Sequence, residues 1–254
     1  MSIKLNSKEY LQNINITEYL KKLDVKDFED FARSIKYFSE NEADKRDKIL
    51  LGYFGEEGLS RITETIIEYL LAPPKLRSES KILDVGCGSG YFTINVAKRV
   101  REQLPKVSFY AMDITPAMLS ELVGKNDKII PFIGVAENIS GSINLARKYV
   151  EAPKRFDAIF STLTLHHCKD VEKVFRSIKE VLRKNGKAII IDLCTHPFKE
   201  FREEMGDIHL GFEPSYIENE AKHFFENVYI KRMAGIGCKC SGRAADLFVA
   251  YLTS

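Results

Sequence analysis

The segment that decides the fold is Ile82-Leu83-Asp84-Val85-Gly86-Cys87-Gly88-Ser89-Gly90-Tyr91-Phe92-Thr93. An apolar run leads into three glycines with the spacing G-x-G-x-G, and an amphipathic stretch follows. Glycine permits a left-handed backbone and lets a ligand approach the chain closely. The segment therefore predicts a strand, a tight turn and a helix start, with the turn at the carboxyl end of a parallel strand, where ligands bind.

Short apolar runs rich in Val, Ile and Phe alternate with amphipathic stretches on the carboxyl side of residue 80. We expect parallel strands at 81–85, 107–112, 129–133, 157–161 and 187–193, with helices such as 91–103, 116–123 and 171–184 between them. Asn185-Gly186 is expected to end the last of these helices. The runs 225–233 and 246–252 are joined by a loop too short for a crossover helix, which predicts an antiparallel hairpin. The predicted class is α/β, a Rossmann-like, seven-stranded, mostly parallel sheet with a C-terminal antiparallel hairpin and helices on both faces.

Residues 1–75 are expected to be helical and to form an N-terminal extension or lid, with the ligand-binding domain at 76–254. Phe31, Ile35 and Phe38 recur at helical spacing and form one apolar stripe. A second helix is expected over 57–71, and Pro73-Pro74 should stop it.

The composition is that of an ordinary globular protein. The chain has 254 residues, 44% hydrophobic and 29% charged, with a net charge of +2. That charge gives no reason to favour nucleic acid or an anionic membrane as partner. No apolar run approaches the roughly 20 residues that span a bilayer, the start is polar, and Cys87 and Cys168, which lie among apolar residues and glycines, are interpreted as free thiols. We therefore expect a cytoplasmic protein, and the oligomeric state stays open.

Two acids indicate which ligand the glycine turn accepts. A dinucleotide fold has the fingerprint G-x-G-x-x-G, which this chain lacks. Asp84, two residues before the first glycine, suits a ligand with an ammonium group better than a pyrophosphate. Asp113 ends the next apolar run, where an acid hydrogen-bonds ribose hydroxyls, although it can also cap the helix that begins at Thr115-Pro116. A purely structural glycine turn is the alternative.

These features resemble the class I S-adenosylmethionine-dependent methyltransferases, in particular the type 11-like branch that acts mostly on small molecules. The resemblance runs from about Asp44 to the end of the chain, and it implies S-adenosylmethionine as cofactor. It implies methionine contacts from Gly86, Cys87, Gly88, Gly90 and Ser161, an amino-group contact from Asp84, ribose contacts from Asp113, and adenine contacts from Ile114, Met118, Ala136 and Glu137. The family often has Gly-Asp-Ala where this chain has Gly134-Val135-Ala136, so a backbone carbonyl or Glu137 must replace the missing acid, or affinity is lower.

The run Leu165-His166-His167 follows the fourth predicted strand, and in the family a similar run lies close to the transfer site. Either histidine is a candidate catalytic base near neutral pH. The alternative is that the two histidines serve only local packing and hydrogen bonding. The sulfonium of the cofactor is already activated, so aligning it with the acceptor can supply most of the acceleration without a base. Adjacent histidines do not share a helix face and no carboxylate completes an obvious triad, so no metal site is predicted.

The acceptor pocket is expected to draw on Tyr53 from the N-terminal helices and on His196 and His209 after the fifth strand. Tyr53 could instead be a buried aromatic staple. Cys238 and Cys240, with thiols elsewhere, raise trivalent arsenic as an acceptor.

The expected function is S-adenosylmethionine-dependent methyl transfer to a small-molecule acceptor by in-line displacement. The alternatives are an RNA or protein methyltransferase, an arsenic methyltransferase, or a non-catalytic binding module. RNA methylation is disfavoured because no Asn- or Asp-Pro-Pro-Tyr element follows the fourth strand.

Overall fold

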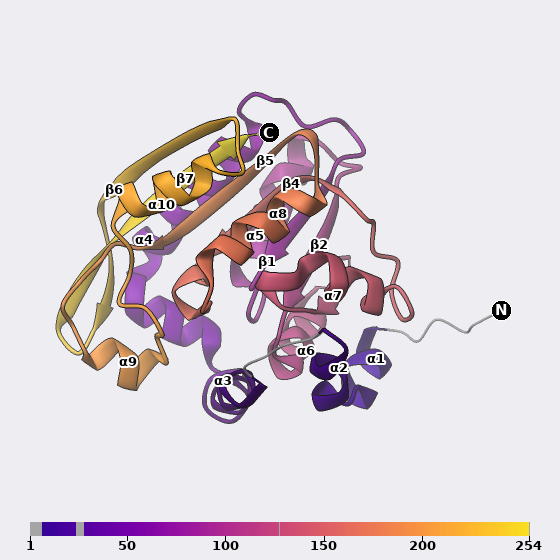
Figure 1. Ribbon diagram of the computed structural model, residues 1–254, viewed down its shortest axis with the longest axis horizontal. Helices are drawn as coiled ribbons and strands as arrows, with labels where there is room; N and C mark the ends of the chain where they lie inside the picture. The colour runs from indigo at the N-terminus through magenta and orange to yellow at the C-terminus, as the bar shows by residue number, and fades with distance from the viewer. Residues whose placement is uncertain (1–6, 24–27, 127, 254) are drawn as a thin grey trace.

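One seven-stranded sheet organises the chain. In the computed structural model, which describes residues 7–23, 28–126 and 128–253, the strands are β1 (Lys81–Val85), β2 (Ser108–Asp113), β3 (Ile130–Ile133), β4 (Phe156–Thr162), β5 (Leu182–Leu193), β6 (Asn227–Cys240) and β7 (Arg243–Thr253). Their order is β3-β2-β1-β4-β5-β7-β6 (Figure 1). The first five run parallel, and β7 is antiparallel to both of its neighbours. The predicted sheet and terminal hairpin are confirmed.

Helices cover both faces of this sheet. The described helices are α1 (Ser7–Asn13), α2 (Ile16–Lys22), α3 (Phe28–Asn41), α4 (Arg46–Leu71), α5 (Tyr91–Gln103), α6 (Pro116–Lys125), α7 (Ile139–Ala146), α8 (Val171–Val181), α9 (Glu200–Met205) and α10 (Pro214–Lys222), with short 3-10 turns η1 (Ala136–Asn138) and η2 (Leu165–His167). α4, α5 and α6 lie on one side of the sheet, and α7, α8 and α10 on the other (Figure 1). The order of strands reverses between β1 and β4, and in open α/β sheets such a reversal opens a crevice at the carboxyl ends of the strands.

The N-terminal helices gather beside that crevice. α1, α2 and α3 lie together near α6 (Figure 1). The Tyr19 hydroxyl lies 2.7 Å from the carbonyl oxygen of Ile133 and donates to it, and the Tyr10 hydroxyl accepts from the Ile133 N–H. These buried bonds attach α1 and α2 to the end of β3. The division of the chain at residue 75 stays a prediction, and α4 itself packs on the sheet.

The described structure differs from the sequence-based expectation at three element boundaries. The helix expected from 57 begins at Arg46 and continues through a non-helical Gly55 (φ 64°, ψ 172°). The helix expected to reach Lys184 ends at Val181, because Leu182 already pairs with Phe156 of β4, so Asn185-Gly186 lies inside β5. The segment around Cys238 and Cys240, which was expected to be a loop, is mostly paired strand. After an interruption, β6 pairs with β7 again from Gly237 to Cys240, and the chain reverses direction only at Ser241-Gly242.

That hairpin turn explains why the ladder extends so far. Ser241 and Gly242 both have positive φ, 46° and 73°, as a two-residue hairpin of type I′ requires. Cys238 and Cys240 therefore alternate with exposed Lys239 and are both buried on one side of β6. Among the residues that the structure describes, no helix is long and apolar enough to cross a bilayer.

Candidate functional site

The glycine turn after β1 is held against β2. The Gly86 N–H donates to the carbonyl oxygen of Met112 at 2.8 Å, and Gly86 has a φ of +74°. A Cβ at Gly86 would lie 2.2 Å from Oγ1 of Thr164, so only glycine fits. A Cβ at Gly90 would instead meet Leu122 of α6 at 2.5 Å. Gly90 therefore allows the start of α5 to pack against α6. The sequence-based expectation that Gly90 lines the cleft is not met.

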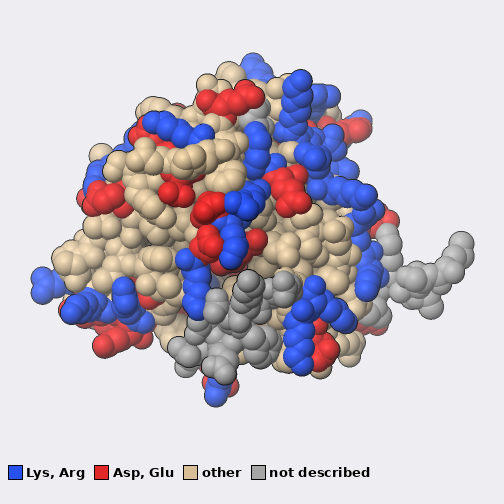
Figure 2. All heavy atoms as spheres, viewed as in Figure 1, with Lys and Arg blue, Asp and Glu red and all other residues tan. Residues whose placement is uncertain are grey.

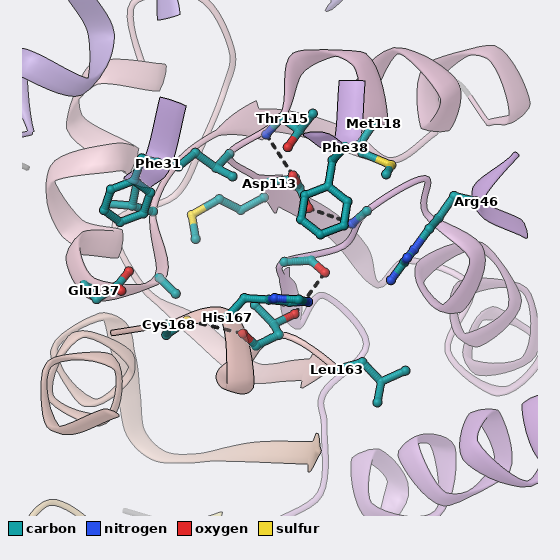
Figure 3. Close-up of a pocket in the computed structure, with 18 residues that line it drawn as sticks. Phe31, Phe38, Arg46, Asp113, Thr115, Met118, Glu137, Leu163, His167 and Cys168 are labelled. Atoms are coloured by element: carbon teal, nitrogen blue, oxygen red, sulfur yellow. Dashed lines mark hydrogen bonds between the residues drawn. The ribbon is translucent and has the colours of Figure 1, made fainter. Parts of the chain in front are cut away.

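A cleft of about 780 Å³ opens above this turn, at the carboxyl ends of the strands (Figure 3). Its lining comes from five separate stretches of chain: Phe31, Phe38 and Arg46; Gly86 and Gly88; Met112 to Thr115 and Met118; Gly134 to Glu137; and Leu163, Thr164, His167 and Cys168. A smaller pocket of about 360 Å³ shares Arg46, Gly86, Gly88 and Leu163 with it and reaches Asp84, Cys87 and Thr162. The two form adjoining parts of one site.

Asp113 presents its carboxylate to the larger part. One oxygen accepts from the Gly88 N–H and the other from the Thr115 N–H, both at 2.8 Å (Figure 3). Burial raises the pKa of Asp113, and these two backbone donors act against that shift. The Thr115 hydroxyl also bonds to this carboxylate, and the lone-pair capacity that remains can accept from a hydroxyl group. Asp113 thus binds the backbone next to α6 and also lines the cleft, while its contact with a ribose stays a prediction.

Asp84 lies in the smaller part. It is buried, and its Oδ2 accepts from the Thr93 hydroxyl at 2.5 Å. Burial raises the pKa of Asp84 to about 8, the Thr93 hydroxyl opposes that shift, and the charge of Asp113 adds to it. The two acids therefore share one site, with Asp84 at the end where a cation would relieve the cost of burying a carboxylate.

The far end of the cleft is mostly apolar. Ile114, Met118 and Ala136 line it, as does Glu137, whose carboxyl pKa is raised by burial. Val135 is also on the wall and offers no side-chain acceptor. α3 borders the cleft with two half-buried aromatic rings: Phe31 lies beside Glu137 (Figure 3), and the centroid of the Phe38 ring lies 5.5 Å from that of His167. The sequence assigned both rings to a helix stripe without connecting them to the site.

The two histidines of η2 have different surroundings. His166 is buried and does not line the cleft; its Nδ1 lies 2.6 Å from Oδ1 of Asp192, and its Nε2 lies 3.5 Å from Oδ1 of Asp207. His167 lines the cleft and donates from Nδ1 to the carbonyl oxygen of Gly206 at 3.2 Å. That bond fixes the tautomer and leaves Nε2 of His167 as an acceptor.

The charges follow from these surroundings. Burial acts to lower the pKa of His166, but the Asp192 and Asp207 carboxylates outweigh it, so that pKa is raised. Burial, the neighbouring His166 and Arg46 lower the pKa of His167 well below its usual value. Burial raises the pKa of Asp207 to about 6, against the attraction of His166.

Several residues expected at the site lie elsewhere. The Ser161 hydroxyl donates to the Val85 carbonyl at 2.8 Å, beneath the glycine turn. Tyr53 lines an open groove next to Glu204 and Cys240. His196 is buried between the rings of Phe198 and Phe201, and His209 donates to the carbonyl of Cys168 at 3.0 Å. The expected acceptor residues Tyr53, His196 and His209 are thus absent from the lining of the cleft.

Other site residues were missed. Arg46 and Thr164 reach the cleft, and Asp192 and Asp207 surround His166. Asp192 carried a usable signal, a single acid in the apolar run Ala188–Leu193 of a buried strand. Asp207 carried none, since its loop is distant in sequence from η2. All five cysteines are free; Cys168 lines the cleft, whereas Cys238 and Cys240 do not.

Comparison with known sequences gives a family. A model described as a methyltransferase domain matches residues 76–230, and one described as protein-L-isoaspartate(D-aspartate) O-methyltransferase matches residues 4–114. The chain is 25% identical over 184 residues to malonyl-[acyl-carrier protein] O-methyltransferase 1 of Ilyobacter polytropus, covering 63% of this chain and 64% of the relative. It is 27% identical over 152 residues to a ubiquinone/menaquinone biosynthesis C-methyltransferase of Rickettsia massiliae, covering 60% and 57%. The chain thus matches less than two thirds of the length of either relative.

Solved structures agree on the fold. The magnesium protoporphyrin IX methyltransferase of Synechocystis, with bound S-adenosylhomocysteine, superposes with a TM-score of 0.62 at 12% identity, over 88% of this chain and 99% of the other. The phosphoethanolamine N-methyltransferase 2 of Haemonchus contortus, in complex with S-adenosyl-L-methionine, gives 0.63 at 14%, over 86% and 59%. Since the methyltransferase-domain model covers more than half of the chain, the chain belongs to the class I S-adenosylmethionine-dependent methyltransferases, as its glycine turn predicted.

Proposed function

We propose that this protein binds S-adenosylmethionine and transfers its methyl group to a small-molecule acceptor by in-line displacement. The observation that carries the proposal is the pair of acids on the glycine turn. Asp113 faces the cleft with free lone pairs, and Asp84 lies in the adjoining pocket. A nucleoside with hydroxyls at one end and an ammonium group at the other matches this arrangement.

Each part of the cofactor has a proposed place. The ribose hydroxyls donate to Asp113, and the methionine amino group lies beside Asp84, along Gly86, Cys87 and Gly88. The adenine lies between Ile114, Met118 and Ala136, where Glu137 is the side chain able to replace the missing acid at Val135. Phe31 borders this end and Phe38 borders the cleft beside His167, and both rings exclude water, which strengthens the electrostatic contacts inside.

The acceptor is proposed to be small. The relatives are named for malonyl groups on a carrier protein, quinones and phosphoethanolamine, and the cleft walls combine Leu163 and Cys168 with the polar Thr164. Acidic and basic side chains are interspersed over most of the face in Figure 2, which does not favour a nucleic-acid footprint.

His167 is the histidine proposed to take a proton from the acceptor when one must be removed. It lines the cleft, and its Nδ1–H is engaged by the Gly206 carbonyl, which leaves Nε2 to accept. The lowered pKa keeps the imidazole neutral at pH 7. His166 is buried next to His167 and is proposed to hold Asp192 and Asp207 in place. Alignment of acceptor and sulfonium is proposed to supply most of the acceleration.

The test is binding followed by product detection. Calorimetry with S-adenosylmethionine and with NAD should give binding for the first alone. Mass spectrometry should then follow an isotope-labelled methyl group into a panel containing a malonyl thioester, phosphoethanolamine, a quinol and arsenite. Transfer to an organic acceptor supports the proposal. Binding without transfer to any acceptor would indicate a non-catalytic module, and methylated arsenic as the single product would favour the thiol-based alternative.

Cofactor binding should release a proton from Asp84. A carboxyl with a pKa of about 8 is mostly protonated at pH 7 in the free protein, and an ammonium group beside it favours the ionised form. Affinity should therefore rise with pH up to about 8. Because the ligand's own amine is partly deprotonated at this pH and takes up a proton on binding, net release at pH 7 should be less than one proton. Calorimetry in buffers of different ionisation enthalpy measures it.

The matched variant for this measurement is Asp84→Asn, which keeps the shape and cannot ionise. It should bind more weakly and show no release. A binding enthalpy of the unmodified protein that is the same in every buffer would contradict the proposed contact.

A further inference from the structure

Leu163, Thr164, His167 and Cys168 line the part of the cleft where the acceptor is proposed to bind, which we call the acceptor end. Three side chains that could ligate a metal ion converge beside it. His166 and His167 come from η2, and Asp207 comes from the loop that follows α9. One ligand atom of each lies within 4.8 Å of the other two. No local sequence signal predicts this group, because the carboxylate is distant along the chain from the two histidines.

The buried atoms of this cluster lack hydrogen-bond partners. Among the described residues, His166 Nε2 and both carboxylate oxygens of Asp207 are buried with no partner in the structure. The separation between His166 Nε2 and the nearer Asp207 oxygen, 3.5 Å, is too long for a good hydrogen bond. A buried polar atom without a hydrogen-bond partner destabilises the fold, so the arrangement points to a further group between them.

His166 is oriented as metal-binding histidines are. Its Nδ1–H donates to Oδ1 of Asp192, which in turn accepts from the backbone N–H of Leu193, while the second oxygen accepts from that of Leu165. A carboxylate behind the imidazole fixes the tautomer and directs the Nε2 lone pair outward, the usual arrangement behind a ligating histidine. Nε2 faces Asp207; without an ion the two carboxylates favour a proton on this nitrogen, and a bound metal ion would displace it.

Asp207 is held opposite His166 by the backbone. The carbonyl oxygen of His166 accepts from the N–H groups of Ile208 and His209, at 3.2 and 2.9 Å. These two bonds lock the loop that carries Asp207 against η2. The ligand pair is therefore preorganised, and half-buried His167 is the member with room to adjust.

We propose that His166, His167 and Asp207 bind one divalent transition-metal ion such as Zn²⁺. With bonds of about 2.0–2.1 Å on both sides, a 3.5 Å separation of His166 Nε2 and Asp207 Oδ1 subtends roughly 115–120° at the ion. That angle is close to tetrahedral. His167 supplies the third ligand, and since it lines the cleft, the remaining position faces the acceptor end.

The donor set and the charge select the class of ion. Two imidazole nitrogens and one carboxylate suit Zn²⁺ or Fe²⁺ better than Mg²⁺ or Ca²⁺, which prefer oxygen ligands. A doubly charged ion would balance the carboxylates of Asp192 and Asp207. Two arginines, Arg46 and Arg202, act on Asp207 through their charge, and Arg46 is paired with Glu42. His196 is not a ligand, because its Nδ1 accepts from the Phe198 N–H and its Nε2 therefore carries the proton.

The inference goes beyond the proposed methyl transfer, which does not require a metal. A bound ion would hold an acceptor through an oxygen, nitrogen or sulfur atom and lower the pKa of that group. His167 would then act as a ligand, and the ion would take over the promotion of acceptor deprotonation.

The experiment uses the full chain without a histidine tag. After equilibrium dialysis against Zn²⁺, metal analysis should find one ion per chain. Asp207→Asn and His166→Gln should each lower Zn²⁺ affinity at least tenfold, and Asp192→Asn, which removes the carboxylate behind the imidazole, by roughly 10- to 100-fold. His223→Gln and Asp246→Asn make the same kinds of change at exposed positions and should retain the ion.

Two further readouts separate this inference from the proposed function. S-adenosylmethionine affinity of Asp207→Asn should be unchanged, which shows that the variant is folded. The visible spectrum of Co²⁺ bound to the unmodified chain should be that of nitrogen and oxygen ligands, a result independent of every variant. Absence of bound metal would overturn the inference. So would equal retention by Asp207→Asn and His166→Gln, or a thiolate spectrum lost in Cys238→Ser/Cys240→Ser.

Discussion

Replacing Asp113 by alanine should weaken S-adenosylmethionine binding by about 1–3 kcal/mol, or roughly 5- to 150-fold. The substitution removes a charged acceptor for the ribose hydroxyls. It also leaves the N–H groups of Gly88 and Thr115 without the carboxylate that now holds the glycine turn close to α6. Calorimetric titration with S-adenosylmethionine, and with S-adenosylhomocysteine as the uncharged-sulfur analogue, measures the change.

Two variants make the Asp113 result interpretable. Asp113→Asn retains one acceptor oxygen and should lose less affinity than Asp113→Ala. Asp246→Ala removes an acid that is 70% exposed and should bind as the unmodified chain does. If folded Asp113→Ala binds with unchanged affinity, the carboxylate does not contact the ribose.

Lys187→Met should lower the free energy of unfolding by about 2–3 kcal/mol. Lys187 is 1% exposed, and its ammonium group donates to the carbonyl oxygens of Tyr69, Leu70 and Ala72 at the end of α4. The last carbonyls of a helix have no partner within it, so this side chain ties α4 to β5. Methionine fills similar space and leaves those carbonyls unpaired. For a chain of this size the midpoint of thermal unfolding should fall by roughly 4–12 °C.

Lys184→Met is the matched control for that measurement. Lys184 lies in the same strand and is exposed, so its loss should change stability by less than about 0.5 kcal/mol. Denaturant unfolding of both variants gives the comparison. Equal stability of Lys187→Met and the unmodified chain would show that the carbonyls find other partners.

Most strands and helices of the fold could be predicted from the sequence, because the patterns that indicate them are local. The strand–turn–helix around Gly86 and the alternation of apolar runs depend on neighbours in sequence. The terminal hairpin followed from a connection too short for a crossover. Boundaries failed where a distant strand competed: Leu182 leaves its helix to pair with Phe156, and Cys238 joins a ladder with Ala245. The turn preference of Asn185-Gly186 persists inside β5: Asn185 has a φ of 61°, and the pairing with β4 is interrupted between Leu182 and Lys187.

The candidate site could be predicted in part for the same reason. Asp113 and Gly86 lie at strand ends, where the topology alone brings them to one edge. The positions of Tyr53 and His196 depend on tertiary packing that the periodicity of the sequence does not indicate. Tyr53 lines a separate groove, and His196 stacks on Phe198. Phe31 and Phe38 belong to an apolar helix stripe of the kind that usually packs into a hydrophobic core. In this structure both rings line the cleft.

Short stretches of chain encode the sheet, the glycine turn and the two acids on it, so these features can be predicted from the residues alone. Which histidine reaches the cleft, and what surrounds the other, depends on how distant segments pack. His166 meets Asp192 and Asp207 because β5 and the loop after α9 fold back on η2, from 26 and 41 residues away. Contacts at such separations follow from how elements pack, and packing depends on the whole chain at once.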